Sequence, residues 1–296
     1  MTRNFRRDGR STLGRLAMAS CLASPFFGST LAADPPPAVD PGVPRLATIP
    51  GRELATGRAA GTVFERAAVT RARAAVGDCR EVFKSVQDYT CTFTKRERVD
   101  GVLSSTHVLT MKARTAPSSV YFRFVEPTPG REAIYVSGRD RNRVLVHDVG
   151  FGKLLAGTIA IDPRGSRAMD GCRHPITEAG LGALLETVSE RWAAELKPGE
   201  TEVRFAEGVR VGGHPCLMIE TTHPTRRPEY LFHRVRLAID PRLGLPVRFQ
   251  AYEWPRTPGG PAELVEEYTY LDLKTNVGLR DSDFDPANAR YSFGRF

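Results

Sequence analysis

The sequence predicts an α+β domain, in which a strongly curved and mostly antiparallel sheet, a half-barrel of about 10–11 strands, is covered by two amphipathic helices. After residue 87, most segments alternate apolar and polar residues with a period of two, which is typical of half-buried strands. Short turns rich in Gly, Pro and Asp separate these segments, as in an antiparallel meander. Two other segments carry apolar stripes with the helical period of 3.6, so each helix has one face to bury against the sheet.

One helix is expected before the strands and one between them. The first covers residues 62–86 and carries a stripe of Ala, Val, Phe and Cys side chains on one face. The second begins after His174-Pro175, with Thr177 as its N-cap, and presents Leu, Val and Trp side chains up to Leu196. Lys197-Pro198-Gly199 ends it, because Pro and Gly disfavour a continuing helix.

The first three strands are expected to form an apolar wall. The first of them alternates apolar and polar residues, and Asp100-Gly101 predicts a tight hairpin because Gly tolerates a positive φ. The charged run Lys95–Arg98 alternates between the two faces and is interpreted as a solvated strand end. The return strand and the third strand also carry one apolar face each. The side chains expected to line this concave face, where an apolar ligand would bind, are Tyr89, Phe93, Leu109, Met111, Phe122 and Phe124.

Further short strands are expected along the rest of the chain. Three lie at residues 131–137, 143–149 and 158–161, and several more lie between residues 202 and 274. Among the later ones, residues 202–206 and 209–211 are expected to form separate strands. The closing segment is polar with spaced aromatic residues, and we expect it to pack as irregular structure.

The N-terminal part of the sequence is expected to contain an export signal and a linker. Residues 1–33 combine a basic start, a short apolar stretch and a small-residue cleavage region, which is typical of an export signal peptide. Residues 34–57 are rich in Pro and form a predicted linker, and residues 58–296 form a single domain. We therefore expect a periplasmic or cell-envelope protein that is peripheral to the membrane at most. Cleavage of the signal and its retention as an anchor are both open.

Charge and cysteine content exclude some functions. The formal net charge of the 296 residues is +8, but five Arg and one Asp of the predicted signal supply half of it. The remainder is too weakly basic to indicate a nucleic-acid partner. Four cysteines follow the signal, and in an oxidising compartment they permit two disulfides, one disulfide or buried thiols. Their spacing matches no zinc site, and the residues concerned are Cys79, Cys91, Cys172 and Cys216.

Several segments resemble known families. Arg173-His174-Pro175-Ile176-Thr177-Glu178, Glu266-Glu267-Tyr268-Thr269-Tyr270 and the closing Asp283-Phe284-Asp285 are similar to an exported bacterial family of unknown function. The helix-then-strand opening around Tyr89–Lys95 and the Asp240…Gly244-Leu245-Pro246 turn resemble, more loosely, the outer-membrane lipoprotein carriers of the LolA/LolB-like superfamily. The second resemblance implies a LolA-like half-barrel with an apolar concave face.

No catalytic or cofactor motif is found in the sequence. It contains neither Gly-x-Ser-x-Gly nor His-Glu-x-x-His, and we expect no metal and no cofactor. Cys172 beside His174 permits a thiol nucleophile with a base, although Arg173 and His174 are also suited to anchoring the turn before the second helix. Arg131 and Glu132 permit anion binding, or an ion pair of Arg131 with Glu126 or Asp148.

Three functions are consistent with these patterns. The leading hypothesis is a non-enzymatic, exported protein that binds a lipid or the acyl chain of a lipoprotein in the concave face. The alternative is an envelope sensor or scaffold that uses the same fold to bind a protein partner. The third is a hydrolase that uses Cys172 or His174.

Overall fold

The computed structural model describes residues 58–149 and 157–294, and it describes side chains from residue 63 onward. The predicted signal peptide and linker lie outside this part of the chain. No helix in the described part is long and apolar enough to cross a bilayer.

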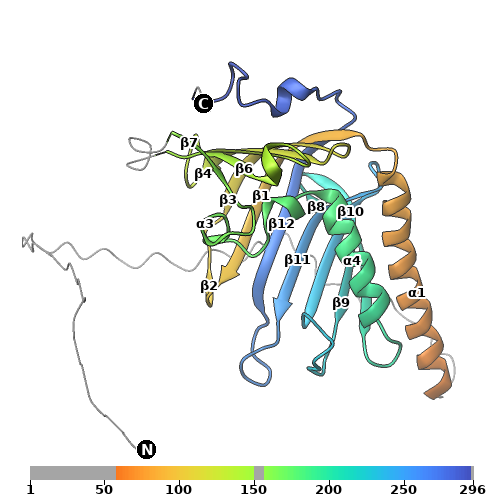
Figure 1. The fold of residues 1–296 in the computed structure, drawn as a ribbon. Coiled ribbons are helices and arrows are strands. Elements are labelled where there is room, and N and C mark those ends of the chain that lie inside the picture. The colour runs from red at the N-terminus through yellow and green to blue at the C-terminus, as the bar shows by residue number, and fades with distance from the viewer. Residues whose placement is uncertain (1–57, 150–156, 295–296) are drawn as a thin grey trace, which may run out of the picture. The chain divides into compact units, whose positions relative to one another are not determined.

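The described chain forms one twelve-stranded sheet in which all paired strands are antiparallel, which confirms the predicted α+β class (Figure 1). The strand order is β7-β6-β5-β4-β3-β1-β12-β11-β10-β9-β8, and the two-residue β2 pairs with β1. The strands are β1 (Asp88–Val99), β2 (Val102–Leu103), β3 (His107–Arg114), β4 (Ser119–Glu126), β5 (Glu132–Val136), β6 (Val144–His147), β7 (Thr158–Ile161), β8 (Glu202–Val211), β9 (His214–Thr222), β10 (Arg234–Asp240), β11 (Leu245–Glu253) and β12 (Glu263–Thr275).

Two local details of the strands test the turn predictions. The Asp100-Gly101 hairpin is confirmed, because both residues have positive φ values, 49° and 80°, between β1 and β2. The two strands predicted at residues 202–206 and 209–211 are in fact the single strand β8. A register shift between Ala206 and Val209 lets this strand continue past Gly208 along β9.

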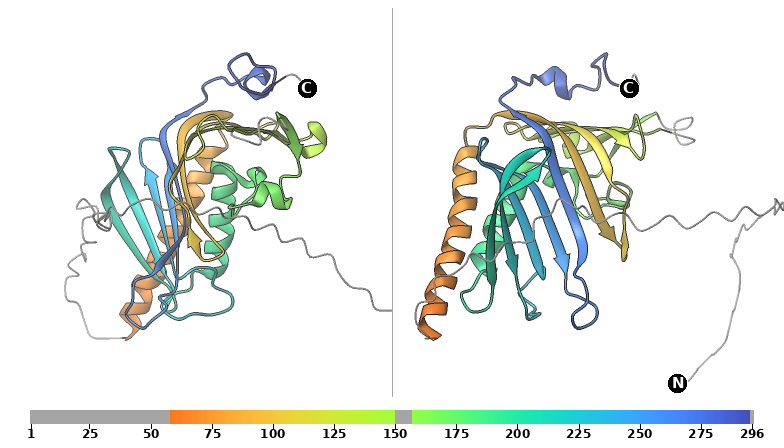
Figure 2. Two further views of the ribbon diagram at one scale, coloured as in Figure 1. Left: turned by 90° about the vertical axis from the view of Figure 1, so that its left-hand side faces the viewer. Right: turned by 180° about the vertical axis from the view of Figure 1, so that it is seen from behind.

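Two long helices cover one face of the curved sheet. Figure 2 shows α4 (Leu181–Glu195) on the concave side, with α1 (Arg58–Phe83) beside it. Both helices contribute to one hydrophobic core together with the inward side chains of the strands, and α1 packs against α4, β8 and β11. The side chain of Arg73 on α1 also donates hydrogen bonds to main-chain oxygens of Trp192 and Leu196 at the end of α4.

The start of the second helix differs from the prediction. Thr177 is not the N-cap but lies in the short 3₁₀ helix η2 (Ile176–Glu178), and α4 begins four residues later. Gly180 is the N-cap, with φ 110° and ψ 173°, a conformation that is essentially restricted to Gly. The main-chain N–H of Leu181 donates to the Tyr89 hydroxyl at 2.9 Å, so a contact with β1 determines where the helix starts.

The convex face of the sheet carries a separate cover, formed by the C-terminal segment that includes η3 (Asp281–Phe284). Phe284 is fully buried in a second hydrophobic cluster with outward side chains of β4, β5 and β6. The carboxylate of Asp88 accepts hydrogen bonds from the main-chain N–H groups of Val277, Gly278 and Leu279, which holds this segment to the start of β1. Apart from η3, the segment packs as irregular structure, as expected, and the structure shows in addition that it covers the convex face.

Candidate ligand cavity and its charged cluster

A cavity of about 740 Å³ lies between the concave face of the sheet and α4. This volume is within the range of small-molecule sites. Its wall is mainly apolar and includes side chains from strands on both sides of the sheet centre, from the connection after β7, which contains α3 (Ser166–Met169), and from α4. Aromatic rings form a ladder across this wall, because Phe93 stacks on Phe122 at 5.8 Å and on Tyr268 at 6.0 Å, and Tyr268 stacks on Phe249.

The structure places four of the six predicted wall residues in the cavity. Phe93, Leu109, Phe122 and Phe124 line it. Tyr89 and Met111 face the same side of the sheet but do not line the cavity, because Gly180 at the start of α4 lies directly on them. These two side chains support the cover helix.

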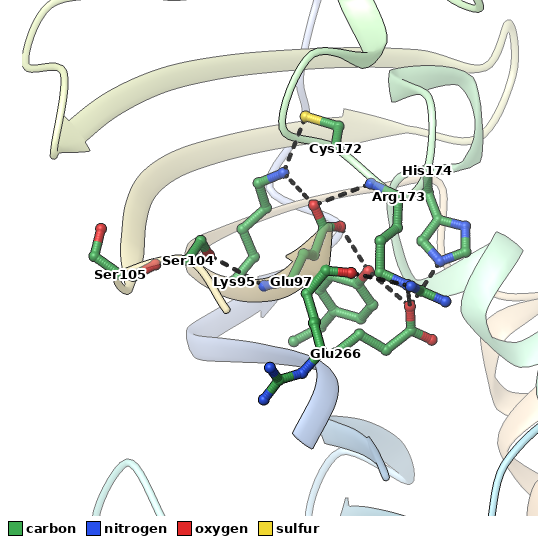
Figure 3. A network of polar contacts seen from close by, with 10 residues as sticks. Lys95, Glu97, Ser104, Ser105, Cys172, Arg173, His174 and Glu266 are labelled. Atoms are coloured by element: carbon green, nitrogen blue, oxygen red, sulfur yellow. Dashed lines mark hydrogen bonds and ion pairs between the residues drawn. The ribbon is translucent and has the colours of Figure 1, made fainter. Parts of the chain in front are cut away.

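A charged cluster, formed by Lys95, Glu97, Arg173, His174 and Glu266, lies in the wall of this cavity (Figure 3). The Lys95 ammonium donates to the Glu97 carboxylate at 2.8 Å and contacts the Cys172 sulfur at 3.4 Å. The Glu97 side chain is only 3% exposed, so this pair is largely removed from water. Separating the two side chains would leave a desolvated charge without a partner, which is strongly unfavourable, so the pair is held together.

The second half of the cluster is centred on Glu266. Its carboxylate oxygen lies 3.0 Å from Arg173 Nε and 2.9 Å from His174 Nε2. The main-chain N–H of Arg173 also donates to Glu97, and its guanidinium donates to the main-chain oxygen of Arg98. The connection that precedes α4 is thus bound to the ends of β1 and β12, which is the anchoring role that the sequence permitted for Arg173 and His174.

The pKa values in the cluster follow from these contacts. Burial alone would lower the pKa of Lys95, but Glu97 and Cys172 raise it above its ordinary value. Burial would raise the pKa of Glu97, but the Lys95 ammonium and hydrogen bonds hold it below its ordinary value. The hydrogen bond to Glu266 raises the pKa of His174. Both members of the Lys95–Glu97 pair are therefore charged at neutral pH.

Tyr268 joins the two carboxylates of the cluster. Its hydroxyl donates to Glu97 at 2.7 Å and lies 3.4 Å from Glu266. Burial and the two neighbouring negative charges raise the pKa of Tyr268, so it remains a donor.

A further polar group of the wall lies at the end of α4. The Glu195 carboxylate is 3.5 Å from the Arg191 guanidinium and 3.8 Å from His223 Nε2. Burial raises the pKa of Glu195 and lowers the pKa of His223 to about 4. His223 is therefore neutral at pH 7, and it contacts the Thr201 hydroxyl through Nδ1 at 3.1 Å.

The remaining predicted pair, Arg131 and Glu132, is divided between the two faces of the sheet. Arg131 lines the cavity and forms an ion pair with Asp148 at 2.8 Å, which is one of the two partners considered from the sequence. Glu132 is fully buried on the convex side, where it accepts hydrogen bonds from the Tyr121 hydroxyl and the main-chain N–H of Ser292. It therefore does not act together with Arg131.

All four cysteines of the described part are free thiols, and three of them are buried. Within the described residues, no group of three or more His, Cys, Asp or Glu side chains is arranged to hold a metal ion. Cys172 contacts Lys95, whereas His174 is bound to Glu266, so the two residues contact different partners. The arrangement fixes the loop and offers hydrogen bonds to the cavity.

The sequence-based interpretation of residues 95–98 as a solvated strand end was wrong for Lys95 and Glu97. Both have the same parity as Phe93, so they continue the inward face of β1 into the cavity. This parity was visible in the sequence. Their partners Arg173 and Glu266 were not, because they are brought to β1 by the loop before α4 and by the β1–β12 pairing.

Comparison with family models identifies the chain's relatives. Residues 86–293 match the model of a family described as "Protein of unknown function (DUF1571)". The chain belongs to this family. The match confirms the resemblance to a family of unknown function seen in the sequence, whereas a comparison with curated proteins found no match.

Solved structures give distant similarities to this DUF1571 protein. A complex of MucA and MucB from Pseudomonas aeruginosa matches with 16% identity and a TM-score of 0.41, over 73% of this chain and 60% of that chain. Lipoprotein LppX from Mycobacterium tuberculosis matches with 12% identity and a TM-score of 0.41, over 72% and 97%. A LolA superfamily protein from Nitrosomonas europaea matches with 12% identity and a TM-score of 0.30, over 72% and 96%.

Proposed function

We propose that this DUF1571 protein is a non-catalytic protein of the cell envelope that binds an acyl chain, from a lipid or a lipoprotein, in the cavity beneath α4. The observation that carries this proposal is the cavity of about 740 Å³ with its ladder of stacked aromatic rings. Each buried methylene contributes about 0.8 kcal/mol, so a chain of about ten methylenes gains on the order of 8 kcal/mol before the costs of association.

Location and chemistry support the same proposal. The basic and apolar character of residues 1–33 supports export to the periplasm or envelope, where acyl ligands are present. A non-catalytic role is supported by the contacts of Cys172 and His174, which are made with Lys95 and Glu266 rather than with each other. The charged cluster would then serve to hold the cover and to bind the polar part of the ligand.

The test is equilibrium binding of a monoacylglycerol that carries a fluorophore at the end of its acyl chain. Ala183 lines the cavity, whereas Ala194 lies on the same helix, is exposed and does not line it. We expect Ala183→Trp to weaken binding at least tenfold, because the indole occupies space that the chain needs, and Ala194→Trp to change it less than twofold. Native mass spectrometry of the full-length protein, purified from envelope fractions, should show a bound lipid.

Two results would overturn the proposal. One is the absence of both probe binding and co-purified lipid in the wild-type protein, which would favour the hypothesis of a protein partner. The other is equal binding by the Ala183→Trp and Ala194→Trp variants, because the probe would then be bound outside the cavity.

A further inference from the structure

The charges in the cavity wall balance one another. Five Lys and Arg side chains and six Asp and Glu side chains line the cavity. Large single-sign fields are the usual means of attracting an oppositely charged ligand, and this wall has none. The balance of charge therefore bears on whether the head group of the ligand is charged or uncharged.

The balance is local, since most of these charges have a partner of opposite sign at short range. Besides the Lys95–Glu97 and Arg173–Glu266 contacts of the charged cluster, two further pairs belong to the wall. Arg131 lies 2.8 Å from Asp148, and Arg191 lies 3.5 Å from Glu195. Glu178 is paired with an arginine behind the wall, Arg164, at 2.7 Å.

The exceptions are at the surface. Arg167 and Asp170, which form no ion pair within the described residues, are both exposed to solvent. Three carboxylates of the pairs are buried, since Glu97, Glu266 and Glu195 are 3%, 4% and 7% exposed, whereas the Asp148 side chain is 37% exposed. A cation can therefore be withdrawn from the three buried acids only by leaving a buried negative charge without a partner.

This arrangement discriminates between ligand head groups. An anionic head group in the cavity has to compete with a buried carboxylate for the Lys or Arg side chain that the carboxylate is paired with. Whichever of the two anions is left without the cation remains desolvated and unpaired, which is strongly unfavourable. An uncharged head group avoids this conflict. Its hydroxyl and ester oxygens can accept hydrogen bonds from the N–H groups of Lys95 and Arg173 that are not already used in the cluster. Its hydroxyl groups can in turn donate hydrogen bonds to the remaining lone pairs of Glu97 and Glu266.

We infer that the cavity selects acyl ligands with an uncharged, hydrogen-bonding head group, of the acylglycerol class, over acyl ligands with an ionised head group such as free fatty acids. This inference rests on the proposed function, because it specifies the ligand of the same cavity. Glu266 sets the selectivity at the charged cluster by neutralising Arg173, whose guanidinium cannot lose its proton.

The test compares two ligands with one acyl chain, 1-palmitoylglycerol and palmitate, at pH 8, where palmitate is ionised in water. Binding is measured by displacement of the fluorescent monoacylglycerol from the full-length protein. We expect the wild-type protein to bind 1-palmitoylglycerol at least tenfold more tightly than palmitate, a difference of about 1.4 kcal/mol. Equal or tighter binding of palmitate would overturn the inference but not the proposed function, whereas failure of both ligands to bind would overturn the proposed function itself.

Removal of a counter-ion should weaken the preference for the uncharged ligand. Glu266→Gln leaves Arg173 without its carboxylate, and we expect it to shift the affinity ratio at least tenfold toward palmitate. Glu263→Gln is the matched control on the same strand, since Glu263 pairs with Arg256 and does not line the cavity, and its ratio should stay within twofold of wild type.

A second variant tests the same idea on a different wall. Asp148→Asn removes the counter-ion of Arg131 without altering the charged cluster, and it should also shift the ratio toward palmitate. Circular dichroism establishes that each variant is folded. If neither Glu266→Gln nor Asp148→Asn shifts the ratio in folded protein, charge pairing does not set the selectivity and the inference is wrong.

Discussion

The contact between Gly180 and Tyr89 offers a quantitative test of how the cover helix is positioned. A Cβ atom at Gly180 would lie well inside van der Waals contact with the Tyr89 hydroxyl and 3.4 Å from the end of Met111. Gly180 also has φ 110° and ψ 173°, a region in which a residue with a side chain is destabilised by about 1–3 kcal/mol. Gly180→Ala therefore has two separate costs, backbone strain and a displaced hydroxyl.

The second cost can be measured alone. Displacing the hydroxyl removes the hydrogen bond from the Leu181 N–H, and Tyr89→Phe removes the same bond without a clash, so we expect Tyr89→Phe to destabilise the protein by about 1–2 kcal/mol. Gly180→Ala should then cost about 2–5 kcal/mol, the strain plus the lost bond. The double variant loses the bond only once, so its cost should be about 1–2 kcal/mol less than the sum of the two single costs.

The assay is urea unfolding of the four proteins, followed by circular dichroism and analysed as a double-mutant cycle. Gly77→Ala is the control, because nothing lies within 4 Å of the added Cβ in α1, and Ala there should leave the protein as stable or stabilise it by up to about 1 kcal/mol. Strictly additive costs, or a Gly180→Ala variant within about 0.5 kcal/mol of wild type, would refute this account of the helix start.

Two further predictions concern groups at the cavity. The pKa of His223 is about 4 in the folded protein, so the stability that neutral His223 provides is complete above pH 6.5 and is lost as the pH falls toward 4. We expect His223→Gln to lessen the decline in unfolding free energy between pH 7.5 and 4.5 by about 2–3 kcal/mol. Equal declines in the wild-type and variant proteins would contradict this. In a Cys21→Ser background, Cys172 should be the thiol that reacts rapidly with Ellman's reagent, because Cys79, Cys91 and Cys216 are buried and burial raises the pKa of each. Cys172→Ala should abolish the rapid phase, and a second thiol reacting at a comparable rate would contradict the burial of the other three.

The sequence was informative where local periodicity decides the structure. The period-two pattern of the first strands predicted which side chains face inward, and four of the six expected wall residues line the cavity. The helix start was missed because it depends on a contact between Gly180 and Tyr89, residues that lie far apart in the chain. Thr177 has a suitable side chain for an N-cap, but no sequence rule reports that β1 occupies the space beneath Gly180.

The charged cluster was missed from the sequence for a different reason. The charged run Lys95–Arg98 was interpreted as a solvated strand end because its residues alternate between the two faces of the strand. Lys95 and Glu97 are buried because they are paired with each other and with groups from the loop before α4 and from β12. Identifying such partners from one sequence requires the tertiary fold. The cover of the convex face was missed for a similar reason, since its anchor is a set of main-chain N–H groups bound by Asp88.

The pairing of β1 with β12 also has a consequence for the order in which the domain is assembled. Phe93 lies opposite Tyr270, so the strand pair at the centre of the wall joins the beginning and the end of the folded region. Closing so long a loop costs entropy before any contact is made, so hairpins such as β10–β11 should form earlier than the centre of the sheet. A chain that is still being synthesised lacks β12, and therefore lacks Glu266 and Tyr268. The complete cavity therefore forms only after β12 has paired with β1, and no ligand can be enclosed in it before that step.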